Sequence, residues 1–293
     1  MTDPRFVLVG AKAQAEAAPQ KMRRHRPPYS TAVLLALIVL PCLLAEVVMT
    51  RDPAYMDLAH CLVAPCREFI FGTDSLGRDI FSMIWYGGRI SLTVGFLATV
   101  IATVLAMIIG SLSALAPRWL DALLMHITDI LLSVPSLLLV LFLQAFFRQN
   151  SVFTLSIVLG ITGWMGMSRV VRTEVLQLRG CEYMEAARLM GGSFFYLLRR
   201  HLAPNFIPSL MFMAVMQFRS AVMAEATLSF IGLGLPLEVV SWGSMLSLAQ
   251  QALLTASWWV VVIPGAFLLV TLVCVTNIGN HLRKVHSHGE RNL

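Results

Sequence analysis

The chain has 293 residues, of which 57% are hydrophobic and 13% charged, and its mean hydropathy is +0.75. A soluble domain cannot bury that much apolar surface, so the composition indicates an integral membrane protein. The net charge of +6 comes largely from basic residues that flank apolar runs, which favours membrane topology over a nucleic-acid partner.

Six apolar runs are predicted to be membrane-spanning helices, because a spanning helix needs about 20 mainly apolar residues. We therefore expect an all-α membrane protein with one transmembrane domain over residues 29–283, between a mobile tail at 1–28 and a second tail at 284–293. The six predicted spans cover residues 30–49, 91–115, 120–147, 152–171, 206–223 and 258–282.

Basic residues set the predicted orientation of these spans. Five Lys and Arg residues lie between positions 12 and 26, ahead of the first span, which places the N-terminus in the cytoplasm. No small-residue cleavage site follows the first apolar run, so we do not expect a cleaved signal. Six spans then return the C-terminus, with Arg283 and Lys284, to the cytoplasm.

The first external loop, residues 50–90, carries polar groups with two possible uses. Thr73, Asp74 or Ser75 can cap the helix that follows, whereas a catalytic pair of Asp74 and Asp79 lacks any accompanying His or metal ligands. Cys61 and Cys66 lie on the side where oxidation is favoured, so the sequence suggests a local disulfide. A metal site that adds His60 to these cysteines is a weaker alternative, and we expect no metal.

Ionisable residues within the predicted spans are costly and usually face protein or water. Asp129 in the third span is predicted to be structural or gate-related, and Arg219 in the fifth span either to line a pathway or to form a helix-packing ion pair. In the fourth span, Gly160, Gly163 and Gly166 predict close helix packing.

A polar, basic, helix-prone island interrupts the apolar pattern between the fourth and fifth spans, at residues 173–204. Two alanines give its first helix a slim face, two glutamates suit the helix N-terminus, and glycine ends it. A second helix leads to Pro204, which precedes the fifth span. We expect the first helix to bind a partner protein. Its key residues are Glu182, Tyr183, Glu185, Ala186, Ala187, Arg188 and Gly191.

The segment 224–257 has no Lys or Arg and is predicted to lie outside. Gly232, Gly234 and Pro236 break any helix, yet the segment is too apolar for a free loop. We therefore expect a re-entrant segment that packs on protein rather than on lipid.

The spacing Glu-Ala-Ala, three residues, then Gly, with Pro204 further on, resembles the EAA loop of ABC importer permeases. Two more blocks, at 72–79 and 228–243, resemble the dipeptide/oligopeptide/nickel permease family, in particular the "C" partner of a heterodimeric pair. Ala203 and Asn280 depart from that pattern, which leaves the subfamily open.

The resemblance implies a type I ABC importer permease fold in a bacterial cytoplasmic membrane. It implies two separate ATP-binding subunits, which bind ATP and Mg, since the chain has no phosphate-binding loop of its own, and docking of residues 182–191 on one of them. It also implies a second permease subunit, an external substrate-binding protein and no catalysis in this chain. Peptides are the expected cargo, with nickel or a metal chelate as the alternative. A secondary transporter or an intramembrane enzyme is disfavoured because inverted repeats and catalytic motifs are not detected.

Overall fold

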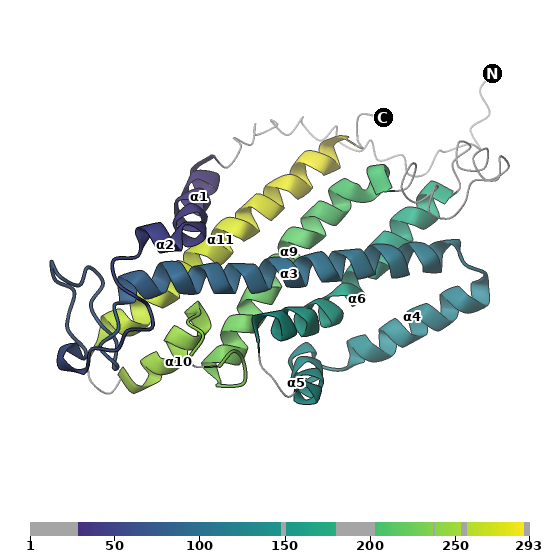
Figure 1. Ribbon diagram of the computed structural model, residues 1–293. Helices are drawn as coiled ribbons and strands as arrows, with labels where there is room; N and C mark the ends of the chain where they lie inside the picture. The colour runs from purple at the N-terminus through teal and green to yellow at the C-terminus, as the bar shows by residue number, and fades with distance from the viewer. Residues whose placement is uncertain (1–28, 148–150, 180–202, 237, 253–256, 290–293) are drawn as a thin grey trace, which may run out of the picture.

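The computed structural model describes residues 29–147, 151–179, 203–236, 238–252 and 257–289, and these form helices and loops (Figure 1). Within these ranges the only strand-like pairing is a bridge between Thr73 and Asp79. The described helices are α1 (Tyr29–Leu43), α2 (Ala45–Val48), the short 3₁₀ helix η1 (Leu58–His60), α3 (Ile80–Leu115), α4 (Arg118–Ser133), α5 (Ser136–Phe146), α6 (Val152–Arg179), α9 (Ala203–Phe230), α10 (Trp242–Ala252) and α11 (Trp258–Gly289).

Among the described residues, three helices are long and apolar enough to cross a membrane: α3, α6 and α11. A fourth span results if the bent pair α4 and α5 counts as one, and α1 is a shorter apolar helix. The all-helical membrane class is therefore confirmed, whereas the six-span count stays a prediction. Helix α3 begins at Ile80, where the Asp79 side chain caps its first turn, and it continues through the whole predicted span at 91–115.

A row of small residues brings α3 against α6. Ala98, Ala102 and Ala106 recur every fourth position and are fully buried. Residues four apart lie on one face of a helix, so their small side chains let the two backbones approach closely, as is common between membrane helices. Helix α3 therefore forms the centre of the bundle, with α6 and α9 packed on it and α11 packed on α9.

The third apolar run contains a sharp bend. Helix α4 ends at Ser133, and α5 starts after Pro135 at an angle of 96° to it. Proline disfavours helical backbone in the residue before it and lacks an N–H of its own, so the helix stops at this point. Only Thr128 is fully buried on α4, which shows that α4 packs loosely on the rest of the chain.

Helix α9 ends where the glycines predicted a break. Gly232 has a φ of +78°, its N–H donates to Ser229 O at 3.0 Å, and the N–H of Leu233 donates to Leu228 O at 2.8 Å. This pair of bonds forms a Schellman cap, which satisfies carbonyls at the helix end. The chain then enters α10, which packs on α9 and α11 and buries Trp242 completely, whereas Ile231 and Leu233 at the turn before it are 51% and 48% exposed. A re-entrant segment stays a prediction.

Candidate functional site

The predicted partner-binding helix, with Glu182, Tyr183, Glu185, Ala186, Ala187, Arg188 and Gly191, lies outside the described residues. Its two flanks are described. Helix α6 ends at Arg179 and α9 begins at Ala203, and both ends lie at the same end of the bundle as the C-terminal end of α11 (Figure 1). Pro204 is in the first turn of α9, where a missing N–H leaves no helix bond unmade.

Near this end, ion pairs and hydrogen bonds fix α6 to its neighbours. Arg172 on α6 donates two bonds to Asp121 on α4, both of 2.6 Å, and Ser113 on α3 donates to the same carboxylate. Two residues nearer the helix end, Ser209 on α9 donates to Glu174 on α6 at 2.9 Å. A bidentate Arg–carboxylate pair fixes the relative orientation of the two side chains as well as their distance. The end of α6 is therefore attached to α3, α4 and α9 together.

Asp129 forms an ion pair with Arg169, which joins α4 to α6 a second time. Both side chains are about half exposed, at 54% and 48%. The sequence predicted that Asp129 has a role, but not which residue pairs with it. In the chain alone, one side of this ion pair is therefore not covered by protein, although α4 and α6 both belong to predicted membrane spans.

Arg219 is half-buried on α9. Within the described parts of the chain, no carboxylate forms an ion pair with it. The described residues thus do not provide the helix-packing ion pair that was one of the two expectations. Lining a pathway stays a prediction for this residue.

A buried carboxylate that the sequence did not single out joins three helices. Glu225 on α9 is fully buried, and it accepts hydrogen bonds from Ser91 on α3 at 2.8 Å and from Ser229 at 3.0 Å. The N–H of Trp242 at the start of α10 donates to the same Ser91 hydroxyl at 3.2 Å. Ser91 and Ser229 are polar residues in apolar runs, which was the available signal for a buried polar site. The contacts of Ser91 with Glu225 and Trp242 join residues more than a hundred positions apart and could not be predicted from the sequence.

In the first loop, Asp74 and Asp79 have distinct structural roles. Asp79, not residues 73–75, caps α3: it accepts bonds from the N–H and the hydroxyl of Ser82, at 3.1 and 2.6 Å, and from Thr50 at 3.0 Å. Asp74 accepts backbone bonds within its own turn and pairs with buried Arg78 at 2.7 Å. Each carboxylate is therefore used in structure, which argues against a catalytic pair.

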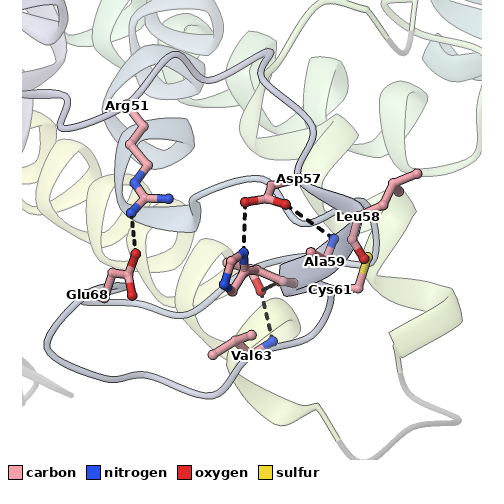
Figure 2. Close-up of polar contacts among 9 residues, drawn as sticks. Arg51, Asp57, Leu58, Ala59, Cys61, Val63 and Glu68 are labelled. Carbon is pink, nitrogen blue, oxygen red and sulfur yellow. Dashed lines mark hydrogen bonds and ion pairs between the residues drawn. The ribbon is translucent and has the colours of Figure 1, made fainter.

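The outer part of this loop is held by short polar contacts (Figure 2). Cys61 and Cys66 are free thiols: the first donates to Leu58 O at 3.3 Å and the second accepts the N–H of Phe69 at 3.4 Å. In the structure each sulfur lies in a contact within its own turn, and the suggested disulfide is not present. No group of three or more metal-ligating side chains occurs among the residues that the structure places.

Next to these thiols, Asp57 and His60 form a 2.8 Å contact across one turn, and Asp57 also accepts the N–H of Ala59 (Figure 2). The hydrogen bond from His60 lowers the pKa of the Asp57 carboxyl below its usual value. Arg51 pairs with Glu68 at 2.8 Å on the exposed side of the same loop. These contacts fix the shape of the loop surface.

Comparison with known proteins gives a consistent picture. Residues 106–284, more than half of the chain, match the family described as "Binding-protein-dependent transport system inner membrane component". The chain is 36% identical over 251 residues to the oligopeptide transport system permease protein OppC of Bacillus subtilis, covering 86% of this chain and 82% of that protein. A Brucella suis protein named as a peptide permease is 34% identical over 95% of this chain and 94% of its own length. The dipeptide transport system permease protein DppC of Bacillus subtilis is 29% identical over 90% of this chain and 82% of its own length.

Proposed function

We propose a function that starts from family membership: the chain belongs to the binding-protein-dependent transport system inner membrane components, and we infer that it is the membrane-spanning permease subunit of an ABC importer. The observation that carries this conclusion is the agreement between the family match over residues 106–284 and relatives that align over nearly the whole chain. The chain itself forms the path and hydrolyses no ATP.

Peptides are the proposed cargo. The three relatives described above are named for oligopeptide, peptide or dipeptide transport, and two of them are at least 34% identical to this chain. Their names favour peptides over the nickel alternative that the resemblance left open. An external substrate-binding protein would deliver the peptide to the loop and α10 side of the bundle.

Residues 182–191 are the proposed coupling helix, which docks on one of two ATP-binding subunits that bind ATP and Mg. The described flanks support this role. Because α6 is attached to α3, α4 and α9 near Arg172 and Glu174, a displacement of the loop after α6 moves several helices together. A second, homologous permease subunit would complete the path, with this chain as the "C"-type partner.

The proposed topology has six spans in a bacterial cytoplasmic membrane, with both termini in the cytoplasm. The coupling loop, at 173–204, then faces inside, and the segment 224–257 faces outside. Single cysteines at Ser75 and Leu237 should react with an impermeant thiol reagent added to intact cells, whereas cysteines at Arg179 and His288 should react only after the cytoplasmic side is opened. Labelling of Arg179→Cys in intact cells would refute this topology.

Uptake of labelled peptides tests the function. In the organism that encodes this chain, deletion should abolish import of at least one class of labelled di- or oligopeptide, and re-expression of the chain should restore it. Uptake of labelled Ni²⁺, measured in the same cells, is the matched control. Unchanged peptide uptake together with lost nickel uptake would replace the proposed cargo with nickel.

A further inference from the structure

Helix α6 exposes opposite sides in its two halves. In the N-terminal half, the exposed residues are apolar: Phe153, Ile157 and Ile161 are 69%, 39% and 41% exposed. In the C-terminal half, Gly166, Arg169 and Thr173 are exposed, and Thr162 on the same face is half-buried. We call these four residues the polar stripe; after it, Leu176 is 38% exposed on the same face. Gly166 follows Ile157 by nine residues, which is a rotation of roughly 180° around a helix of 3.6 residues per turn.

The polar stripe stops where protein covers the same side of the helix. Nearer the start of α6, Leu155, Val158 and Leu159 occupy that side and are at most 4% exposed, in a core that includes Val140 of α5 and Leu228 of α9. The stripe is therefore closed at Thr162 and runs from there toward the end of α6, where the predicted coupling loop begins.

Space beside the stripe distinguishes Gly166 from the other two glycines of this helix. A Cβ at Gly160 would lie 2.6 Å from the Ile101 side chain and 3.1 Å from Ala98 O, so Gly160 serves close packing as predicted. A Cβ at Gly163 would overlap the end of the Gln217 side chain. A Cβ at Gly166 would meet nothing within 4 Å, so no other described helix of this chain packs closely on Gly166.

The hydroxyls of the stripe are already paired within the helix. Thr162 donates to Val158 O at 3.0 Å, and Thr173 donates to Arg169 O at 2.9 Å. The stripe therefore needs no partner protein to satisfy its hydroxyls, and it can lie against water.

The Arg169–Asp129 ion pair lies in this stripe within the predicted spans. Arg169 is two residues before position 171, where the fourth span is predicted to end, and Asp129 is nine residues after the predicted start of the third span at 120, roughly 14 Å from that end. A carboxylate and a guanidinium, each half exposed, are costly against lipid and are usually found facing protein or a water-filled cavity. The open space at Gly166, one turn away, favours water.

We propose that the polar stripe of α6, together with Asp129 of α4, is the wall of the cytoplasmic half of the substrate pathway, closed toward the outside by the packing around Leu155, Val158 and Leu159. The inference rests on the proposed import function, since a pathway has meaning only in a transporter. It assigns the Arg169–Asp129 pair to the water-filled side of the chain and the apolar face with Ile157 to the lipid or subunit side.

Thiol labelling tests this assignment. Single cysteines are introduced at Thr162, Gly166 and Thr173, with Phe153→Cys and Ile157→Cys as exposed controls on the other side of the same helix. The host chain has its five native cysteines replaced by alanine. Inside-out membrane vesicles that contain the complete transporter are treated with a positively charged methanethiosulfonate. The stripe cysteines should react at least about tenfold faster than the controls, because a charged reagent enters lipid only at a cost of a few kcal/mol.

Three results would overturn the assignment: stripe cysteines that do not react, stripe and control cysteines that react equally, or stripe cysteines that react only from the outside. Each variant is scored only if it inserts in the membrane at the level of its parent. Because three stripe positions are tested, the experiment remains informative if one variant fails to insert. Peptide uptake is measured separately. Labelled stripe cysteines in a chain that imports no peptide would refute the proposed cargo while the pathway assignment stands.

Discussion

The buried pair of Asp74 and Arg78 should dominate the stability of the first external loop. Both side chains are 4% exposed. One Asp74 oxygen accepts the N–H groups of Leu76 and Arg78 at 2.9 and 2.8 Å, and the other accepts Arg78 Nε at 2.8 Å and lies 2.7 Å from Nη2. Asp74→Ala leaves a buried guanidinium without its counter-charge, which costs about 3–5 kcal/mol.

The same loop offers a matched control. Arg51 Nη2 lies 2.8 Å from Glu68 Oε1, close to the 2.7 Å of the Arg78–Asp74 pair, but the two side chains are 35% and 62% exposed. Breaking such an exposed pair by Glu68→Ala should cost about 0–1 kcal/mol, because water screens the charges and both side chains stay solvated. The comparison thus separates burial from mere ion pairing.

Amide hydrogen exchange of the purified chain, read by mass spectrometry, gives the measurement. The loop closes through backbone bonds from Leu62 to Asp74 O and from Thr73 to Val63 O, both of 3.0 Å. In Asp74→Ala, exchange of these amides should accelerate by roughly 10²- to 10⁴-fold, since each 1.4 kcal/mol is a factor of ten. Peptides from α6 should keep their protection. Equal acceleration in the Asp74 and Glu68 variants would refute the argument from burial.

Three further outcomes are expected. Gly191→Val should abolish transport and release the ATP-binding subunits without loss of membrane insertion, because a β-branched residue disfavours the turn that ends the coupling helix; normal transport would remove that assignment. Mass spectrometry of alkylated, unreduced protein should find Cys61 and Cys66 as two free thiols, and a peptide pair linked by a disulfide would contradict the structure. The turn held by Asp57 and His60 should lose protection from hydrogen exchange as the pH falls through the lowered pKa of Asp57, since the stabilising carboxylate exists only above that pKa; Asp57→Asn should lack this acid dependence, and an unchanged profile would show that the contact does not order the turn.

Local chemistry explains which parts of the fold the sequence predicted well. The end of α9 follows from Gly232, whose positive φ suits glycine, and the break before α5 follows from Pro135. The angle of 96° at that break does not follow from composition, because it depends on what α5 packs against. A capped helix after the first loop was expected, but its cap is Asp79 rather than Thr73, Asp74 or Ser75, and the predicted span at 91–115 covers only the later part of α3.

The polar contacts between helices were the part that the sequence could not supply. Asp121 pairs with Arg172 and Asp129 with Arg169, over separations of 51 and 40 residues. The sequence marks such residues as costly within a span, so each needs a partner or water. Only the packing of α4 against α6 decides which charge meets which.

The two ion pairs between α4 and α6 also explain how a loosely packed helix can follow its neighbour. Apart from Thr128, the residues of α4 are partly or largely exposed, so apolar packing alone fixes α4 weakly. Asp121 and Asp129 lie about two turns apart and attach it at two points, and one attachment alone would leave α4 free to rotate about it. A pull on the end of α6 is therefore transmitted to α4 through charges rather than through a hydrophobic interface. Such a contact can break and re-form in water without exposing apolar surface, as the proposed pathway wall would require.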